Sequence, residues 1–396
     1  SSGFSRFFDP IRMDMGISYT QMALVFSLAR AEGGMGGPLV GWLVDKFGSR
    51  PMIFFGGLAA GIGLILLAHA QSYGQLVLIF VGIVSVGKTA GLGQTLMATV
   101  NQWFIRRKAV ALSTLMTAFA GGGAIVVPIL HLGIVNLGWR DTLQYTGIFI
   151  VLLTLPVAWI IRSKPEDMGL RPDGDPIEPA REASPDPGKP QQTPEQDFTV
   201  RQAMHTSTFW LMLFGVVTRV SATNAIIVHL FPILQWKGLD DTEATLYASI
   251  MFFLAIPLRF LLGVAGGKFS SRKLLFWGMN LGAVGLLGLW LIPGIPGIVI
   301  FMLGLAIVEG ITSVNWIMLG DYFGRSRFAS LMGIMSVFHN MGLFVSPIYA
   351  GMVRDHTGSY SLVLITFAPM FVASAILFSL ARKPAMPAQS PFANRG

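Results

Sequence analysis

The decapeptide GWLVDKFGSR occupies residues 41–50 and ends a long apolar stretch. A variant of it, GVAGGKFSSR, occupies residues 263–272 and ends an apolar stretch in the second half of the chain. Glycine, lysine, phenylalanine, serine and arginine recur at the same positions of the two decapeptides. This recurrence indicates that the two halves of the chain repeat one architecture.

A second pair of motifs repeats in the same order. WFIR at residues 103–106 resembles YFGR at residues 322–325, and in that register Pro128 falls on Pro347. Two motif pairs in consistent order predict two parallel helical halves joined by a linker. Membrane transporters use this arrangement to place a substrate site between the halves.

The composition of the chain indicates a lipid environment. Of its 396 residues, 53% are hydrophobic and only 12% are charged, and the mean hydropathy is +0.63. A soluble domain carries about 25% charged residues. The chain contains no cysteine, which excludes a disulfide framework and a thiolate metal site.

Eleven stretches are long and apolar enough to span a bilayer as helices, which takes about 20 mostly apolar residues. They cover residues 20–44, 52–70, 76–100, 110–135, 143–161, 208–234, 243–265, 274–292, 297–319, 329–352 and 361–381. We therefore predict an all-α membrane protein that crosses the bilayer many times.

A polar, proline-rich segment at residues 163–206 separates two groups of spans. Such a composition is typical of a solvated linker. We predict an N-terminal helical bundle at residues 1–162, a C-terminal helical bundle at residues 207–382 and a disordered tail at residues 383–396.

Lysine and arginine are distributed unevenly between the two sets of loops. The linker and the C-terminal tail are basic, and so are the loops that contain Lys46, Arg50, Arg106, Arg107, Lys108, Lys268, Arg272, Lys273, Arg325 and Arg327. The opposite loops hold Arg6, Arg12, Arg140, Lys237 and Arg354. This bias predicts a multi-pass protein of the inner (plasma) membrane with a cytoplasmic C-terminus. The net charge of +8 thus reflects topology, and basic residues scattered over short loops do not predict nucleic-acid binding.

The spacing Gly41-x-x-x-Asp45-x-x-Gly48-x-Arg50 resembles the signature loop between the second and third helices of the major facilitator superfamily. The resemblance extends over almost the whole chain and implies the major facilitator fold, with two pseudo-symmetric six-helix bundles. It also implies a cytoplasmic gate formed by Gly41, Asp45, Gly48 and Arg50, in which Arg50 is a candidate partner of Asp45. Residues 1–16 resemble only the end of the family's first helix and the following loop, so we expect a truncated sequence.

Narrower features resemble the monocarboxylate and oxalate/formate branch of this superfamily. They are Arg259 followed by Gly263, HLFP at residues 229–232, PEDMGL at residues 165–170 and DHTGSY at residues 355–360. The resemblance implies transport of a small organic anion by proton symport or anion exchange. Members of the branch often carry an aspartate one turn before the arginine, whereas this chain has Ala255 there. A proton-carrying aspartate at that position is therefore not implied.

Polar residues lie near the middle of several predicted spans, where a charge costs about 2.5–3.5 kcal/mol on insertion scales. They are Arg30, Glu32, Lys88, Arg219, Arg259, Glu309, His339 and Asn340. Four of them are cations and two are acids. A buried surplus of positive charge favours an anionic ligand that neutralises it. Arginine suits a carboxylate because its planar fork donates two parallel hydrogen bonds.

The predicted substrate site consists of Arg259 as the main carboxylate anchor, assisted by Lys88 or Arg219, with His339 and Asn340 nearby. Each of these residues also has a structural interpretation. Arg219 can pair with a neighbouring helix, Lys88 can extend its amine toward the membrane surface, and His339 can be a hydrogen-bonded packing residue.

Two acids, Glu309 and Glu32, are the predicted proton carriers if transport is a symport. Glu309 can instead be a structural ion-pair partner of Arg259 on a neighbouring helix. Arg30 and Glu32 are two residues apart on one helix, so they point in different directions and do not pair locally.

Motifs of enzymes and primary pumps are absent from the sequence, which contains no HExxH, P-loop or GxSxG pattern. We therefore predict no enzyme activity, no metal and no cofactor. We also predict that the protein is a monomer in the lipid bilayer, and that its partners are a small organic anion and, in a symport, protons. Two alternatives stay open. One is an efflux carrier of the same fold for other amphiphilic solutes, which would need a mainly apolar, acid-lined cavity. The other is a non-transporting membrane sensor or fragment.

Overall fold

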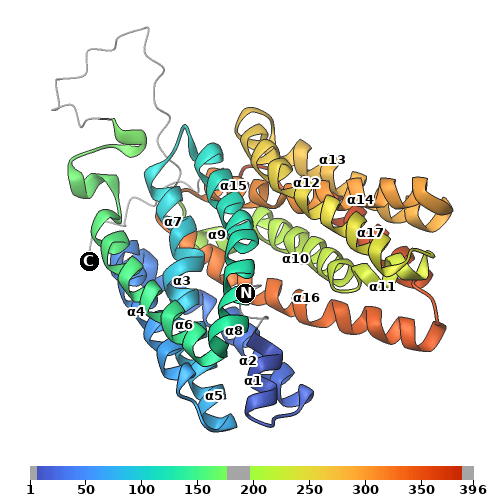
Figure 1. Cartoon of the computed structure of the whole chain (residues 1–396). Coiled ribbons are helices and arrows are strands. Elements are labelled where there is room, and N and C mark those ends of the chain that lie inside the picture. Colours follow the sequence, from blue (N-terminus) through green and yellow to red (C-terminus); the bar gives the residue numbers. More distant parts are fainter. Residues whose placement is uncertain (1–6, 176–196, 386–396) are drawn as a thin grey trace.

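The computed structural model describes residues 7–175 and 197–385, which form helices joined by short connections (Figure 1). The first half contains α1 (Phe8–Asp14), α2 (Tyr19–Met35), α3 (Gly37–Phe47), α4 (Ser49–Ala68), α5 (Tyr73–Ile79), η2 (Phe80–Ser85), α6 (Val86–Lys88), η3 (Thr89–Gly93), α7 (Gln94–Trp103) and α8 (Lys108–Ile160). The second half contains α9 (Val200–Met204), α10 (Ser207–Val228), α11 (Leu230–Trp236), α12 (Asp241–Lys268), α13 (Ser271–Leu291), α14 (Gly294–Gly310), α15 (Thr312–Phe323), α16 (Phe328–Thr357) and α17 (Ser361–Leu380). The predicted linker contains η4 (Pro165–Met168), η5 (Pro172–Gly174) and α9, while its residues 176–196 and residues 386–396 of the predicted tail lie outside the described residues.

Nine helical stretches in residues 7–175 and 197–385 are long and apolar enough to cross a membrane. One of them, α8, contains two of the predicted spans, because Gly138 adopts a φ of 81° and turns the chain between them. The predicted span at 20–44 is divided between α2 and α3, each of which is shorter than a full span. With these two adjustments the helices correspond to the eleven predicted spans.

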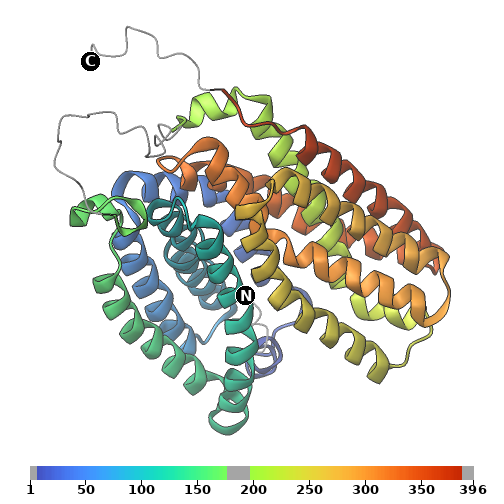
Figure 2. The ribbon, with the colours of Figure 1, turned by 90° about the horizontal axis from the view of Figure 1, so that it is seen from above.

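The two halves form two groups of helices that meet through a few elements. α16 lies along α2 and α3, and α12 lies along α8. Figures 1 and 2 show the groups as two bundles, coloured blue to green and yellow to red. This helical architecture confirms the predicted fold class, while the residue boundaries of the bundles stay a prediction.

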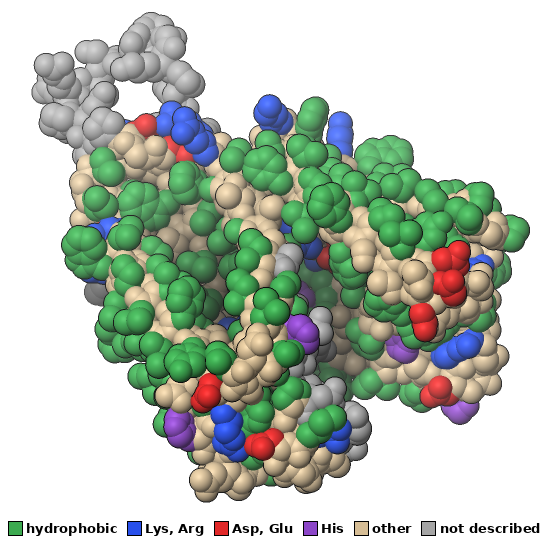
Figure 3. Space-filling model, viewed as in Figure 1, with side chains coloured by type: hydrophobic (Ala, Val, Ile, Leu, Met, Phe, Trp, Pro, Cys, Tyr) green, Lys and Arg blue, Asp and Glu red, His purple; other side chains and the backbone are tan. Residues whose placement is uncertain are grey.

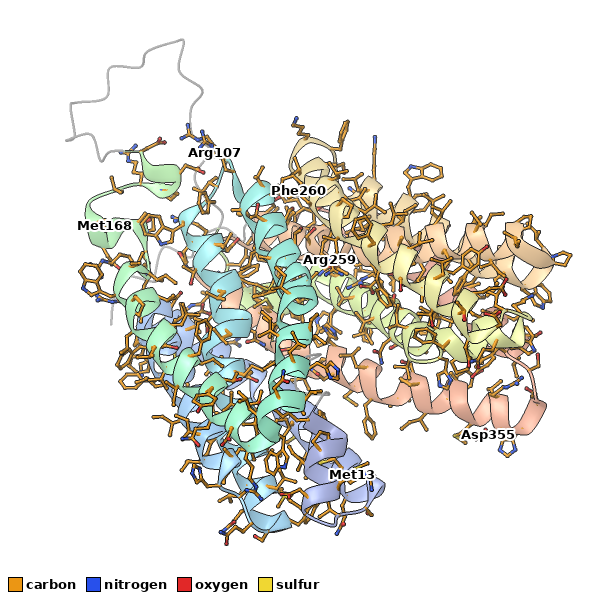
Figure 4. All side chains as sticks on the ribbon, viewed as in Figure 1. Met13, Arg107, Met168, Arg259, Phe260 and Asp355 are labelled. Atoms are coloured by element: carbon orange, nitrogen blue, oxygen red, sulfur yellow. The ribbon has the colours of Figure 1, made fainter. Side chains whose placement is uncertain are left out.

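The two ends of the bundles differ. We call the end with Arg107 and Met168 the linker side, and the opposite end, with Met13 and Asp355, the far side (Figure 4). The bundles diverge from the linker side toward the far side (Figure 1), and the space-filling surface is hollowed between them (Figure 3). Hydrophobic side chains are abundant on the face seen in Figure 3, as expected for helices that face lipid.

Three of the predicted spans are interrupted midway. Gly36 separates α2 from α3, and Ile311 separates α14 from α15. In a third span, the π-helical segments η2 and η3 flank the short helix α6, which carries Lys88. Interrupted helices and π segments are frequent at functional sites. The sequence did not predict these breaks, because internal glycines are common in uninterrupted membrane helices as well.

Candidate functional site

Arg259 lies on α12 about midway between the linker side and the far side (Figure 4). Its Nη2 atom donates to Oε2 of Glu309 on α14 at 2.9 Å, so the two residues form an ion pair. Their side chains are 18% and 23% exposed, respectively. The structural interpretation of Arg259 as a partner of Glu309 therefore describes this state of the molecule.

The ion pair lies at the break between α14 and α15. The backbone oxygen of Glu309 accepts hydrogen bonds from Nε and Nη2 of Arg259, both at 3.3 Å, and from Thr312 Oγ1 at 3.0 Å. These donors satisfy a carbonyl group at the end of α14, where a cation also interacts favourably with the helix dipole. Arg259 is thus held by a carboxylate and by a helix C-terminus together.

Arg219 on α10 is more deeply buried than Arg259, with 4% of its surface exposed. Its Nη2 atom lies 3.5 Å from Oδ1 of Asn315, a long hydrogen bond that is lost if the Asn315 amide is oriented to satisfy Thr312 and Trp316. Within the described residues, Nε of Arg219 has no hydrogen-bond partner.

The charges around Arg219 do not balance. It interacts electrostatically with Glu309 and Arg259, and Glu309 is already paired with Arg259, so Arg219 has no ion-pair partner within the described residues. An uncompensated buried charge is costly, and an anion is the natural partner for it. The described side chains of this cluster therefore include more guanidinium groups than carboxylates.

Two further predicted site residues lie on α16. His339 is partly buried and interacts electrostatically with Arg219, which places it beside the same cluster. Asn340 donates from Nδ2 to the backbone oxygen of Ser336 at 2.7 Å and lies against Gly34 of α2. Asn340 thus lies where α16 meets the other half.

The predicted residues of the N-terminal half form a second polar group. Ser85 Oγ lies 2.6 Å from Glu32 Oε2 and 3.1 Å from the backbone oxygen of Ala29. Lys88 is exposed and lies one turn beyond Ser85. The side chain of Arg30 lies outside the described part of the structure.

The predicted gate residues lie on the linker side. Oδ2 of Asp45 accepts a hydrogen bond from the backbone N–H of Ser330 at 2.9 Å, in the first turn of α16. A carboxylate at a helix N-terminus satisfies a free N–H group and interacts favourably with the helix dipole. Gly41 lies directly against the backbone of Ala329, where a Cβ atom would overlap the carbonyl oxygen.

Gly48 and Arg50 make their contacts within the N-terminal half. Gly48 adopts a φ of 84°, which allows the tight turn between α3 and α4. Arg50 donates from Nε to the backbone oxygen of Ala158 at 3.0 Å, and its own N–H donates to Ser163 Oγ at 3.1 Å. The structure therefore pairs Arg50 with the end of α8 rather than with Asp45.

The sequence did not identify several residues that join the halves. Gln102 Nε2 donates to the backbone oxygen of Arg325 at 2.9 Å, and Arg325 Nη1 donates to the backbone oxygen of Gln102 at 2.7 Å. Lys108, which is 5% exposed, donates to Asp321 Oδ1 at 3.2 Å. The repeated motifs at 103–106 and 322–325 are the only sequence signal near these contacts.

Within residues 7–175 and 197–385, no group of three or more histidine, aspartate or glutamate side chains is arranged to hold a metal ion. The polar groups of the cluster are instead arginines, an acid, amides and a histidine. Such groups can bind and release a charged solute and can carry a proton.

Comparisons with known proteins agree with this architecture. A family model described as "Major Facilitator Superfamily" matches residues 3–318 and residues 220–395. Human monocarboxylate transporter 6 is 26% identical over 395 residues, with 94% of this chain and 74% of that protein covered. The proton:xylose symporter XylE, solved with 6-bromo-6-deoxy-D-glucose, superposes with a TM-score of 0.72 at 14% identity, covering 96% of this chain and 92% of XylE. FucP, solved in the outward conformation, gives a TM-score of 0.70 at 15% identity, covering 96% of this chain and 94% of FucP.

Proposed function

The chain belongs to the major facilitator superfamily of membrane transporters, and on that premise we propose that it carries a small organic anion, a mono- or dicarboxylate. The observation that carries the proposal is the buried Arg219, which forms no ion pair within the described residues, while the nearby Glu309 is already paired with Arg259. A carboxylate substrate would complete the charge balance of this cluster. The names of relatives such as monocarboxylate transporter 6 support the same substrate class.

The substrate would bind to side chains that contact each other in this structure. A substrate carboxylate can accept hydrogen bonds from Arg219 and from Arg259, displacing Glu309 from Nη2 of Arg259. Lys88, His339 and Asn340 would supply further polar groups to the substrate. We assign Arg259 and Arg219 together as the anchors, where the sequence alone placed Arg259 first.

Energy would come from an ion or anion gradient. In a proton symport, Glu309 or Glu32 carries the proton. Glu309 would be protonated when the substrate displaces it from Arg259. Binding of the substrate and binding of the proton would then be coupled. Glu32 would exchange its proton beside Ser85. In an anion exchange, neither acid changes its protonation state.

Transport would proceed by alternating access. The linker side is closed by Asp45, Gly41 and the contacts between Gln102 and Arg325. Opening these contacts while closing the far side would expose the anion site to the other face of the membrane. The proposal includes an inner (plasma) membrane location, a cytoplasmic linker and C-terminus, and a monomeric carrier.

Uptake into proteoliposomes tests the proposal. Labelled lactate, formate and oxalate are offered with and without an imposed pH gradient, and at least one should accumulate. Dependence on the pH gradient indicates symport, and dependence on internal carboxylate indicates exchange. Transport of none of them, or undiminished transport by Arg259→Ala, would contradict the proposed anion site. Arg272→Ala is the matched control, because Arg272 lies at the start of α13, outside the cluster.

A further inference from the structure

An aspartate of the linker organises the loop that precedes α8. The carboxylate of Asp173 accepts hydrogen bonds from the backbone N–H groups of Ile105, Arg106 and Arg107 at 3.2, 2.9 and 3.2 Å. Its side chain is only 4% exposed. Three successive N–H groups around one carboxylate form an anion-binding nest, here occupied by a side chain of the same protein.

The backbone of Asp173 is held in an unusual conformation. Its φ of 65° is the only positive φ of a non-glycine residue in the described part of the chain. Such a conformation costs free energy and persists only where the surroundings enforce it. Here the surroundings are a tight turn, closed by a hydrogen bond from Arg171 N–H to the backbone oxygen of Asp175 at 2.7 Å, and an ion pair in which Nη2 of Arg106 lies 2.8 Å from both carboxylate oxygens of Asp175.

The other described end of the linker repeats this contact on the second half. Oδ1 of Asp197 accepts hydrogen bonds from the backbone N–H groups of Arg325 and Ser326 at 2.8 and 3.2 Å. In the repeat register these two residues correspond to Arg106 and Arg107. The next residue, Phe198, is fully buried and donates its N–H to the oxygen of Phe323 at 3.1 Å.

The two loops held in this way lie at one of the contacts between the halves. Gln102 and Arg325 exchange hydrogen bonds across the interface, one in each direction. Glu166 of the linker also reaches across, with Oε1 3.3 Å from Nη2 of Arg325. The linker therefore touches both sides of the closed gate.

We propose that the linker is a working part of the linker-side gate, in which Asp173 and Asp197 are positioning residues. They hold the loops at 104–107 and 323–326 in the shape that lets Gln102 and Arg325 bond to each other. Glu166 then strengthens the closed state directly. The proposal rests on the alternating access proposed above and assigns a conformational role to residues that contact no substrate.

Opening of this gate can be measured with spin labels on introduced cysteines, because the chain contains no cysteine of its own that would also be labelled. Lys46→Cys and Lys268→Cys place one label at the linker-side end of each half, on exposed residues. Distances between the labels are measured in lipid nanodiscs with and without oxalate or lactate. The test variants are Asp173→Ala, Asp173→Asn and Glu166→Gln, and the matched control is Asp167→Ala. Asp167 belongs to the same linker segment, and its carboxylate accepts a bond from Lys164 N–H.

Removal of the Asp173 carboxylate should raise the long-distance, gate-open population about fivefold. Asp173→Asn keeps one acceptor oxygen and should give an intermediate population, and Glu166→Gln should give a smaller increase. The linker proposal is overturned if the parent shows both the gate-closed and the gate-open distance, and Asp173→Ala has the same gate-open population as the Asp167→Ala control. If the parent itself shows one distance under every condition, alternating access and the linker proposal both fail. A melting measurement confirms that each variant is folded.

Discussion

Two pseudo-equivalent contacts close the linker side of the molecule, α3 against α16 and α12 against α8, and they differ in chemistry. At the first, Asp45 bonds to the N-terminus of α16 through Ser330 N–H. At the second, the equivalent position is Gly267, which lies against the side chain of Ala109 at the start of α8. The two contacts therefore lie at equivalent positions of the repeat, but a hydrogen bond forms the first and apolar packing forms the second.

The closeness of the helices differs in the same way. A Cβ atom on Gly41 would overlap the backbone oxygen of Ala329, and one on Gly333 would overlap the backbone of Gly37. At the second contact, a Cβ atom on Gly263, the repeat equivalent of Gly41, would instead overlap the side chain of Ser113, and one on Gly267 would meet the Cβ of Ala109 at 2.5 Å. A side chain can be made smaller by substitution and a backbone atom cannot, so the first contact should be the less tolerant of change.

The largest effect is expected for Gly41→Ala. Overlap with a backbone atom costs about 1–3 kcal/mol or more, so initial uptake by proteoliposomes should fall about tenfold. The second substitution Ala329→Gly should not rescue it, because the clash is with the backbone oxygen. Gly74→Ala is the matched control, since Gly74 lies in the first turn of α5 and a Cβ there has no neighbour within 4 Å. Rescue by Ala329→Gly would show that the contact is looser than described.

Asp45→Ala should have the next largest effect. Loss of a carboxylate cap at a helix N-terminus costs about 1 kcal/mol, which would favour the gate-open state about fivefold. Asp45→Asn retains an oxygen for Ser330 N–H and should lose less. Distances between spin labels across the linker side measure both variants. Equal populations in Asp45→Ala and the parent would mean that Ser330 N–H contributes nothing to closure.

Gly267→Ala tests the second contact. We expect about a threefold loss of uptake, because the new methyl group displaces Ala109. Ala109→Gly in the same chain should restore most of the uptake, in contrast to the pair Gly41 and Ala329. Equal recovery of uptake in the double variant at Gly41 and Ala329 and the double variant at Gly267 and Ala109 would contradict the proposed difference between the two contacts.

Asp321→Asn should have the smallest effect. Lys108 is buried, but Asp321 is 46% exposed, and the substituted asparagine keeps an oxygen that can accept from the Lys108 amine, so the loss should stay below about 1 kcal/mol. A shift of about twofold in the gate-open population at low ionic strength should shrink in high salt, because ions screen the pair. A shift that does not depend on salt would point to packing of the Lys108 side chain instead.

Much of the fold could be predicted from sequence. Hydropathy located the eleven spans, and the motifs at 41–50 and 263–272 revealed the repeat. Hydropathy averages over several turns, so it did not show the breaks at Gly36 and Ile311 or the π segments beside Lys88.

The partners of the site residues could be predicted only in part. The sequence offered Glu309 as an alternative partner of Arg259, and the structure pairs them. It could not predict that Asp45 bonds to Ser330 N–H or that Arg50 bonds to the Ala158 oxygen. Such partners are backbone groups far away in sequence, and which one is reached depends on how each helix is rotated about its axis.

The most direct test of the central claim is the affinity of the protein for a labelled carboxylate with and without the Arg219 guanidinium. Equilibrium binding of the carboxylate that is transported best is measured for the parent, for Arg219→Gln and for the control Arg272→Gln. The account predicts that Arg219→Gln raises Kd by about tenfold or more while the control leaves it unchanged. Parent-like affinity in Arg219→Gln would contradict the claim that its buried charge is there to be neutralised by an anionic substrate.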